Sequence, residues 1–478
     1  MNNFKKLTFA LVSAALLAGC SQGGASSATS ESKADAGSAT ISSADSNNSQ
    51  ESEESISTSG KTEIITVWVH KSSEEPEGKV YKQLATNFNK AGIKNSAGST
   101  LRVNMEFYGS TLDTKVTGAL LTNGLPDVLA VDSPDITANV YNNILVDFSS
   151  QVSEEEKNDY VTSVLEQSTI DGKLYALSGM EAPGGLYYNK KVLESVGYTE
   201  SDFGTLENPW SWKDVKNAMV KLKNAKKAYK IKLNLGFGTD GYMYLYSPLV
   251  YSAGATFGSD GSVEAALTSD KAVAGIQQFE MFFDKEGLSD GESWSYSGSN
   301  EYAFLQEADD VAFEIYGPWH LSSLKQGNYT IADHYGIMPM PVYEDASGNK
   351  SKIVSTPCGS YGFGVTRDNK SLENSAAVVK YLTGKDASEM MYNAIGTFPT
   401  HKSSLSTLTD LQTGAAKSLN DYLNANTITR PKMTKYPMLK AAYQEVLSYI
   451  KNKNSLGSSY NLKNKISQEM RAVDKSRA

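Results

Sequence analysis

Apolar and polar positions in the first third of the chain alternate between strand-like and helix-like patterns. Residues 63–70 are rich in β-branched side chains, as in a buried strand, and Val80, Leu84 and Phe88 then recur at helical spacing. In chain order, the pattern predicts strands at 63–70, 101–107 and 124–132 and helices around 80–88 and 114–121. This alternation predicts an α/β lobe with a largely parallel sheet, whose strand ends point loops at the edge where ligands bind.

The segment 171–198 carries two short apolar runs separated by glycine and proline. It predicts a strand at 174–177, a broken crossing, a strand at 186–188 and a helix that begins near Asn189. Two strands joined by a flexible crossing fit a passage between two lobes, but they fit an ordinary β-hairpin equally well. The pattern alone leaves both interpretations open.

Helical and strand-like patterns continue over the second half of the chain. Further strands are expected at 311–316 and 359–366, and further helices around 215–222, 273–279, 374–382 and 439–450. A chain of 478 residues with 40% hydrophobic residues can bury large cores, and its length favours two or more domains over one.

The first twenty residues predict a targeting segment. Lys5 and Lys6 form a basic region, and residues 7–17 form an apolar stretch too short for a permanent membrane helix. The segment ends in Leu-Ala-Gly-Cys at 17–20, which resembles the bacterial lipobox. That resemblance implies cleavage before Cys20 and a diacylglycerol on its sulfur. The alternative is an incidental cysteine near an ordinary cleavage site.

The predicted signal peptide, 1–19, is followed at 20–61 by a stretch of Ser, Ala, Thr, Glu and Asp with almost no large apolar side chains. This composition cannot offset the entropy of ordering, so we expect a disordered, Ser-rich tether behind the lipidated cysteine. A long tether of this kind resembles those of Gram-positive lipoproteins. With Cys20 lipidated, Cys358 has no partner for an intrachain disulfide.

Charge and motif content argue against several function classes. A formal net charge of -9 without a Lys/Arg run argues against a nucleic-acid partner and against anionic membrane surfaces.

Motifs of common catalytic sites are incomplete or missing. Residues 358–362, Cys-Gly-Ser-Tyr-Gly, have cysteine where a nucleophile elbow needs its first glycine, so we interpret Ser360 as a turn or ligand-contact residue. No phosphate-binding loop motif occurs, and the four histidines lack metal-ligand spacing: His70, His320, His334 and His401. We therefore expect no catalytic residue, no cofactor and no metal.

A series of short motifs resembles, in the same order, the sugar-binding lipoproteins of ABC importers, extracellular solute-binding protein family 1, which includes maltose-binding protein. The matching segments are 124–128 with 145–148, 172–177 with 186–190, 209–214, 317–319 (Gly-Pro-Trp), 335–341 and 398–402. The resemblance implies a two-lobe periplasmic-binding-protein-like α/β fold, each lobe a mostly parallel sheet flanked by helices. It implies a first lobe of 62–180 with 362–402 and a second lobe of 181–361 with 403–478, with hinge crossings at 179–183 and 357–362.

The same resemblance implies a function of capture without reaction. We expect a monomer that binds an oligosaccharide outside the cell, closes around it and delivers it to ABC transporter permease subunits. Its membrane association would be through the lipid anchor alone, at the outer face of the cell membrane. Two alternatives stay open: a secreted carbohydrate-active enzyme, with Asp132 and Glu181 as paired carboxylates, and a sugar sensor or adhesin on the same fold.

Sugar recognition needs flat aromatic faces and a few fixed polar groups. Trp319 occupies the family's Gly-Pro-Trp position, which implies that it stacks on the sugar. The alternative is that Trp319 is a structural residue of the core. Tyr242 and Tyr244 occupy the positions at which family members have an acidic and an aromatic ligand contact. Because Tyr242 replaces the acidic residue, the hydrogen bonds that this position makes to the sugar are left open. The predicted ligand-binding residues are His70, Asp132, Glu181, Tyr242, Tyr244, Trp294, Trp319, Ser360, Tyr361 and Tyr436. Of these, Tyr361 and Tyr436 fit a core role equally well, whereas Trp68 is expected in the core.

Overall fold

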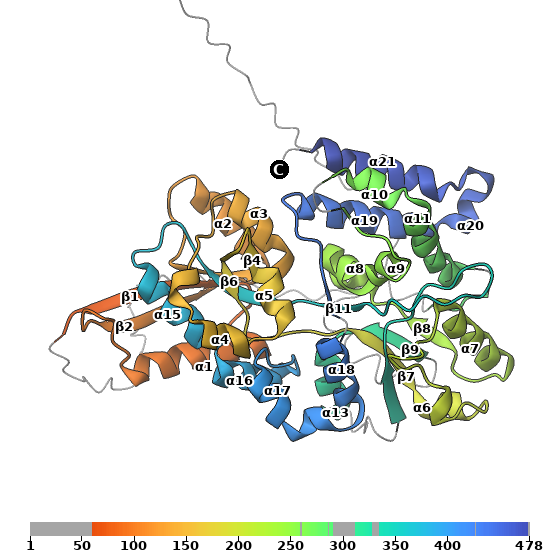
Figure 1. The fold of residues 1–478 in the computed structure, drawn as a ribbon, viewed down its shortest axis with the longest axis horizontal. Coiled ribbons are helices and arrows are strands. Elements are labelled where there is room, and N and C mark those ends of the chain that lie inside the picture. Colours follow the sequence, from red (N-terminus) through yellow and green to blue (C-terminus); the bar gives the residue numbers. More distant parts are fainter. Residues whose placement is uncertain are drawn as a thin grey trace, which may run out of the picture. The chain divides into compact units, whose positions relative to one another are not determined.

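The computed structural model describes residues 60–258, 261–284, 286–289, 311–326, 334–425 and 427–476. These residues form two main sheets, each surrounded by helices (Figure 1). The first sheet has the order β2-β1-β3-β12-β6, with β1 (Thr62–Val69), β2 (Thr100–Phe107), β3 (Val128–Asp132), β6 (Ala176–Leu177) and β12 (Tyr361–Val365). The second has the order β10-β7-β9-β8, with β7 (Gly185–Asn189), β8 (Lys230–Lys232), β9 (Val311–Tyr316) and β10 (Tyr335–Met338).

Two short ribbons complete the strands of the described residues. Strands β4 (Thr169–Ile170) and β5 (Lys173–Leu174) pair antiparallel, and β11 (Thr356–Cys358) pairs parallel with β13 (Thr427–Thr429). Because β11 directly precedes β12 of the first sheet, this second ribbon lies on the path by which the chain passes between the sheets.

The predicted α/β class is confirmed, and most strands of each sheet run in one direction, as expected: all but β12 in the first sheet and all but β7 in the second. In the first sheet β1 is parallel to β2 and β3, whereas β12 is antiparallel to β3 and to β6. In the second sheet only β8 and β9 pair parallel. A parallel neighbour needs a crossover connection back to the same sheet. The chain enters β7 and β12, the reversed strand of each sheet, from the other sheet, so no such crossover fixes their direction.

The helices follow the predicted apolar periodicity. Around the first sheet lie α1 (Pro76–Ala91), α2 (Leu112–Leu120), α3 (Ile136–Tyr141), α4 (Glu154–Asp159), α5 (Thr162–Ser168), α15 (Leu372–Thr383), α16 (Lys385–Ile395) and α17 (Lys402–Thr407). Val80, Leu84 and Phe88 are all buried on α1, as their spacing predicts. Trp68, expected in the core, is indeed buried there.

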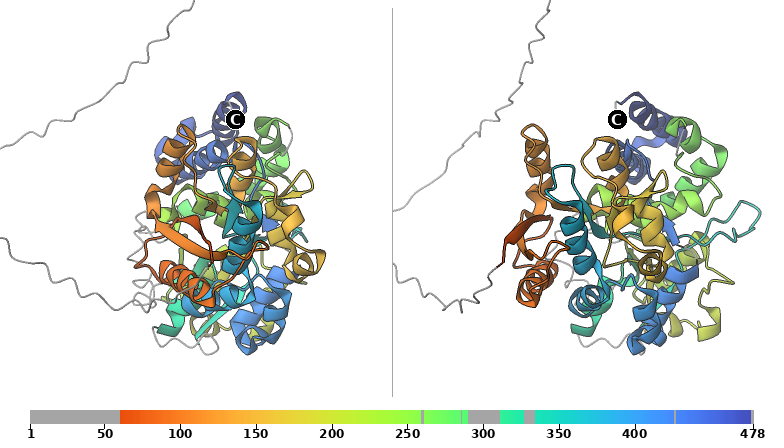
Figure 2. Two further views of the ribbon diagram at one scale, coloured as in Figure 1. Left: turned by 90° about the vertical axis from the view of Figure 1, so that its left-hand side faces the viewer. Right: turned by 60° about the vertical axis from the view of Figure 1, so that its left-hand side comes forward.

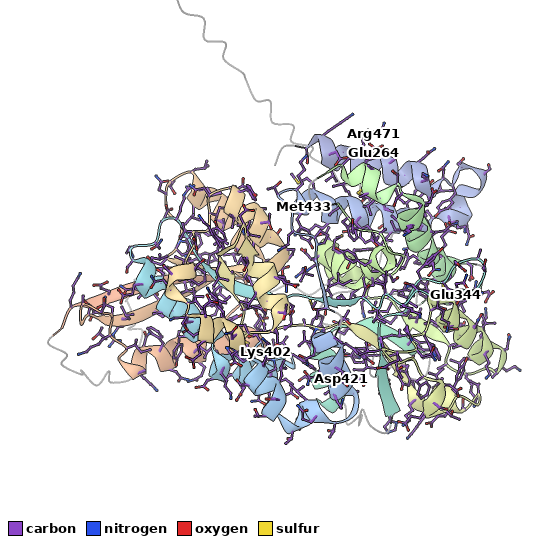
Figure 3. All side chains as sticks on the ribbon, in the orientation of Figure 1. Glu264, Glu344, Lys402, Asp421, Met433 and Arg471 are labelled. Atoms are coloured by element: carbon purple, nitrogen blue, oxygen red, sulfur yellow. The ribbon has the colours of Figure 1, made fainter. Side chains whose placement is uncertain are left out.

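The second sheet and the core next to it are surrounded by helices from distant parts of the chain. They are α6 (Lys190–Glu194), α7 (Trp212–Asn224), α8 (Gly238–Tyr246), α9 (Pro248–Tyr251), α10 (Val263–Leu267), α11 (Asp270–Gln277), α13 (Trp319–Gln326), α18 (Gly414–Ala425), α19 (Tyr436–Lys451), α20 (Lys453–Leu456) and α21 (Leu462–Lys475). Helix α21 packs against α10 and α19 (Figure 2). Arg471 on α21 pairs with Glu264 on α10, with Nη2 and Oε1 2.7 Å apart (Figure 3).

The motif at 209–214 begins α7 through local hydrogen bonds. Ser211 Oγ accepts a hydrogen bond from the Asp214 backbone N–H at 3.1 Å, and Asp214 Oδ2 accepts one from the Ser211 N–H at 2.7 Å. This capping box satisfies two backbone donors that the helix itself leaves unpaired, and it orients the helix so that Trp212 is buried. Within the described ranges, no helix has the length and apolarity needed to cross a membrane.

Candidate functional site

A buried arginine, Arg430, lies where the end of the first sheet meets helix α8. It follows directly after β13, and its guanidinium forms two hydrogen bonds with the carboxylate of Asp132 at the end of β3. Nη1 donates to Oδ2 at 2.9 Å and Nη2 donates to Oδ1 at 2.5 Å. Nη1 also lies 3.6 Å from Asp240 Oδ1 on α8. This paired geometry is the strongest form of an arginine–carboxylate contact.

The ion pair continues into a chain of alternating charges. Tyr436 donates from its hydroxyl to Asp240 Oδ1 at 3.0 Å, and Lys440 Nζ donates to Asp240 Oδ2 at 2.7 Å. Lys440 Nζ also lies 3.6 Å from Asp135 Oδ2. Asp132 and Asp135 flank the end of a first-sheet strand, whereas Asp240, Tyr436 and Lys440 belong to α8 and α19. The network therefore ties together the two sides of the molecule.

Burial and neighbouring charges shift several pKa values in this network. Burial raises the pKa of Asp135 to about 7; Lys440 opposes that shift, and Asp132 and Asp240 add to it. Burial by itself would lower the pKa of Arg430, but Asp132 and other neighbours outweigh it, so the pKa of Arg430 lies well above its usual value. Arg430 therefore stays charged, and Asp135 is the group that changes protonation near neutral pH.

Glu181, in the crossing between the sheets, is almost completely buried, at 1% exposure. Its carboxylate accepts hydrogen bonds from Ser163 Oγ at 2.6 Å, from the Ala182 N–H at 3.0 Å and from the Gly359 N–H at 2.5 Å. Burial raises the pKa of Glu181 despite these donors. The side chain thus joins α5 to both crossings, and its oxygens are already engaged by protein groups.

Two aromatic stacks flank the charged network. Tyr361, the first residue of β12, stacks on His70 with ring centroids 3.5 Å apart and planes 5° apart. His70 Nε2 lies 3.0 Å from Glu77 Oε1. Burial raises the pKa of Tyr361, and the carboxylate of Asp132 raises it further. The imidazole therefore covers one face of the phenol ring, next to the end of β3.

The second stack is formed by Tyr244 on α8 and Trp319 at the start of α13. Their ring centroids are 5.9 Å apart with planes 29° apart. Tyr244 donates from its hydroxyl to the Ala182 carbonyl at 2.6 Å, and the Arg430 guanidinium carbon lies 6.0 Å from the centre of its ring. Trp319 is only partly buried and packs against both cores.

The structure brings most of the predicted residues together around Arg430. Those within the network, its flanking stacks or the adjoining crossings are His70, Asp132, Glu181, Tyr244, Trp319, Ser360, Tyr361 and Tyr436. Tyr242 lies elsewhere: its ring faces Tyr246 in the second core, in which Tyr244 and Tyr436 are also buried. Trp294 lies outside the described residues, as does Cys20. Arg430 was not anticipated, because one arginine before a proline carries no periodic or motif signal.

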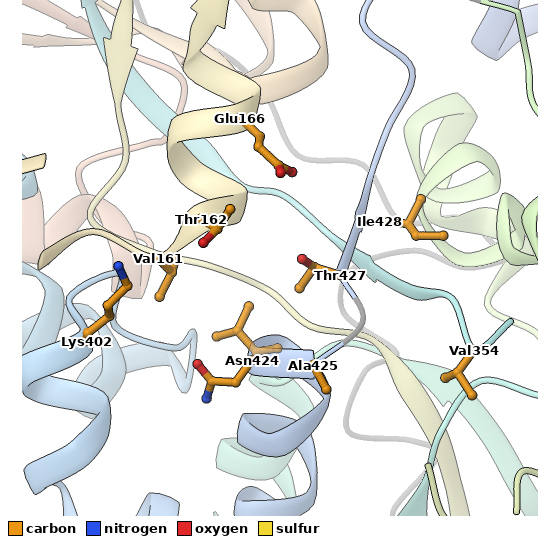
Figure 4. Close-up of a pocket in the computed structure, with 10 residues that line it drawn as sticks. Val161, Thr162, Glu166, Val354, Lys402, Asn424, Ala425, Thr427 and Ile428 are labelled. Atoms are coloured by element: carbon orange, nitrogen blue, oxygen red, sulfur yellow. The ribbon is translucent and has the colours of Figure 1, made fainter. Parts of the chain in front are cut away.

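Three hollows border this region. The one next to Glu181 and Ser360 has a volume of only about 10 Å³, so a pyranose ring enters only if the side chains around it separate. A cavity of about 400 Å³ opens beside β13, between Thr162 and Glu166 of α5, Asn424 of α18 and Lys402 (Figure 4). Another, of about 440 Å³, is lined by segments that include 432–435, 169–171 and Asp474. Among the residues described, no three His, Cys, Asp or Glu side chains are grouped as around a metal ion.

Comparison with known sequences gives one family and several distant relatives. A model of the family described as bacterial extracellular solute-binding protein matches residues 71–389. The maltodextrin-binding protein MdxE of Bacillus subtilis is 27% identical over 202 residues, 40% of this chain and 44% of that protein. A probable ABC transporter-binding protein of Deinococcus radiodurans is 22% identical over 245 residues, 50% of this chain and 54% of that protein. The chain thus spans about half the length of these two relatives.

Solved structures match over more of the chain. The sugar-binding protein MalE of Xanthomonas citri has a TM-score of 0.68 at 16% identity, covering 86% of this chain and 97% of that one. The GacH receptor of Streptomyces glaucescens, solved unliganded and with acarbose, has a TM-score of 0.66 at 17% identity, covering 87% and 100%. At this level of identity the likeness shows the fold, and it confirms the predicted two-lobe α/β architecture.

Proposed function

Because the chain belongs to the bacterial extracellular solute-binding protein family, we propose that it is the carbohydrate-binding component of an ABC importer. It would bind an oligosaccharide outside the cell and deliver it to the permease subunits. The names of similar proteins support a sugar of the maltodextrin type, since they include a maltodextrin-binding protein, a maltotriose-binding protein and a cyclo/maltodextrin-binding protein complexed with maltotetraose. The observation that carries the proposal is the pair of aromatic stacks, His70–Tyr361 and Tyr244–Trp319, on either side of a buried charged pair.

Aromatic faces and charged groups at this site suit a sugar. The C–H face of a pyranose ring packs on an aromatic plane, while its hydroxyls need fixed hydrogen-bonding groups. The two stacks offer the planes, and Asp132 and Arg430 offer an acceptor and a donor at their centre. The ligand-binding residues are proposed to be His70, Asp132, Glu181, Tyr244, Trp319, Ser360, Tyr361 and Tyr436, joined now by Arg430. The second-core position of Tyr242 supports a structural role for that residue, and Trp294 stays a prediction.

Binding is proposed to couple to closure of the two lobes. A ligand stabilises the closed state when it contacts both lobes at once, because it then binds that state more tightly. The site draws its residues from strand ends of the first sheet and from helices around the second, and its smallest hollow is too narrow for a sugar ring. Opening about the crossings at 179–183 and 357–362 would therefore admit the ligand. The lobes would comprise 62–180 with 362–402 and 181–361 with 403–478.

The N-terminal segment is proposed to place this binding domain at the outer face of the membrane. Removal of residues 1–19 and lipidation of Cys20 would leave residues 20–61 as a tether, as in a Gram-positive lipoprotein. The lipid would be the sole membrane contact, and the protein would act as a monomer.

A glycan panel monitored by thermal unfolding tests the proposed function. Maltotriose, maltotetraose and unrelated oligosaccharides are added to the purified protein, and the melting temperature is recorded. A ligand at a hundred times its Kd should add about 2.7 kcal/mol of stability. If no saccharide at millimolar concentration shifts the melting temperature, carbohydrate binding is contradicted.

Chromatography of the recovered sugar separates binding from hydrolysis, because a binding protein returns it intact and a glycosidase returns fragments.

A further inference from the structure

The turn at 317–319, which joins β9 to α13, is tightly packed. The Trp319 ring lies over Gly317, where a Cβ would be 2.4 Å from two of the ring carbons. On another side is Gly396, where a Cβ would be 3.2 Å from the Pro318 carbonyl oxygen. Tyr187 donates from its hydroxyl to the Gly317 carbonyl at 2.8 Å. The path of the turn is therefore fixed, and the angle of the indole depends on the rings beneath it.

Next to this turn the protein buries a histidine against a glutamate side chain. His320 Nε2, on the residue after Trp319, lies 2.7 Å from Glu314 Oε2 on β9, and the two side chains are 1% and 2% exposed. The other carboxylate oxygen, Oε1, accepts a hydrogen bond from Asn234 Nδ2 at 2.9 Å. Apolar residues of similar volume often replace a buried ion pair with equal or better stability. Stability alone therefore does not account for this pair, and its geometry points to another role.

A chain of ring contacts connects the pair to Trp319. The His320 ring packs edge-to-face against Tyr187, at 5.1 Å and 80°, and against Tyr316, at 5.2 Å and 86°. Tyr316 in turn packs edge-to-face against Trp319, at 5.1 Å and 75°. Because such packing fixes the angles between neighbouring rings, a rotation of His320 would move Tyr316 and tilt the indole above it.

We propose that Glu314 and His320 are positioning residues for Trp319: their buried pair holds the indole at the angle at which it stacks on a sugar ring. Both side chains are buried behind the ring of Tyr316, so each is proposed to act on the ligand through Trp319. This inference rests on the proposed carbohydrate binding, to which it adds two residues that act through a third.

A double-mutant cycle tests this role, with a sugar identified by the panel as the ligand. Glu314→Gln and His320→Gln are each expected to weaken binding about tenfold when Trp319 is present, which corresponds to about 1.4 kcal/mol. In the Trp319→Ala background the same changes should alter affinity by less than about twofold, because the residue they position is gone. His401→Gln is the matched control, since His401 is also buried but packs on Tyr160. Equal losses in both backgrounds would overturn the proposal.

A second readout needs no sugar. The protein is labelled with 5-fluorotryptophan, and the Trp319 fluorine resonance is assigned by its loss in Trp319→Phe. Glu314→Gln should shift that resonance, and His401→Gln should not. If the Trp319 resonance shifts but no saccharide binds, the positioning role stands and the proposed ligand class is rejected. If the resonance does not move, the positioning role is overturned.

A milder variant guards against failure to fold. Asn234→Gly removes one hydrogen bond to Glu314, and the backbone at this position has a φ of 52°, which glycine adopts without strain. The Trp319 resonance should move in the same direction as in Glu314→Gln, by a smaller amount. If neither glutamine variant folds, the Trp319 fluorine resonance of Asn234→Gly is the test. If that resonance does not move relative to the unchanged protein, the proposal is overturned.

Discussion

Buried charges in this protein are paired residue by residue, as in the group formed by Asp132, Arg430 and Asp240. An isolated ion inside a protein is costly, and pairing with an opposite charge through hydrogen bonds offsets that cost. Arg430 satisfies both carboxylate oxygens of Asp132 and also lies 3.6 Å from Asp240. A sugar hydroxyl entering this site would compete with the arginine for the same oxygens. Arg430 is therefore proposed to influence ligand affinity even though its first partner is the protein itself.

Trp319→Ala is expected to weaken sugar binding by roughly ten- to a hundredfold. The reason is that an indole face covered by a sugar contributes on the order of 1.5 to 3 kcal/mol. Calorimetric titration measures the affinity and thermal melting measures the fold. Trp212→Ala is the control, because Trp212 is 1% exposed and should lose roughly 3 to 5 kcal/mol of folding stability. A large fall in melting temperature with normal affinity would instead make Trp319 structural.

Asp135 is expected to make stability depend on pH. Its pKa is about 7 in the folded protein against 3.8 for the unperturbed group, so between these values the folded state holds a proton that the unfolded chain has released. Stability should therefore fall as pH rises from about 4 to about 7 and level off above, by at most about 4 kcal/mol at 1.36 kcal/mol per pKa unit.

Denaturant unfolding across this pH range checks the expectation for Asp135. Asp135→Asn should flatten the profile, because the amide has no proton to release. An equally steep profile in the variant would assign the pH dependence to another group.

At the scale of elements, helix α8 explains why two nearby tyrosines have different surroundings. Positions two apart on a helix do not face the same side. Tyr244 therefore reaches the Arg430 network while Tyr242 packs beside Tyr246 in the second core. The sequence placed both in the site because it offered no way to orient the helix.

The β11–β12 connection depends on a glycine. Gly359 has a φ of +122°, and a Cβ there would lie 2.6 Å from Gln167 Oε1 and 2.8 Å from Ser133 Oγ. Gly359→Ala is expected to cost more than the roughly 1 to 3 kcal/mol of backbone strain alone, because both side chains must also move.

Gly348→Ala is the matched control for this substitution. Its φ is also positive, at +86°, but the nearest atom to a new Cβ would be 4.0 Å away. Chemical denaturation of the two variants measures the difference. Equal losses would show that backbone strain accounts for the whole effect.

At the scale of the whole molecule, two cores are joined by crossings and by one buried charged network. This arrangement predicts compaction on ligand binding, because a sugar that contacts both sides favours the closed state. Small-angle scattering at saturation should give a smaller radius of gyration than the protein alone, whereas a saccharide that gives no thermal shift should leave the radius unchanged. An unchanged radius with the bound sugar would count against closure.

Cys20→Ser is expected to release the protein from the cell without changing its sugar affinity. The predicted lipid site is separated from the described domain by the predicted tether, so the cleft should not sense its loss. Cell fractionation and titration measure the two properties. A variant that stays membrane-bound would contradict the lipid anchor.

Apolar periodicity was enough to predict many of the strands and helices. Strands β1, β2 and β3 and helices α1, α7 and α19 all lie where apolar periodicity predicted them, because side-chain period is a local property that a short window reveals. The predicted strand ends also identified His70 and Asp132 as candidate site residues. The order of the short motifs along the chain predicted the two-lobe fold.

Which groups meet depends instead on contacts between distant parts of the chain. Arg430 and Asp132 are 298 residues apart in the chain, and no local pattern relates a single arginine to a particular aspartate. The antiparallel pairing of β12 with β3 likewise depends on the route of the chain between two sheets. The partner of a buried charge and the direction of a returning strand are set by long-range packing, which a pattern of neighbouring residues does not contain.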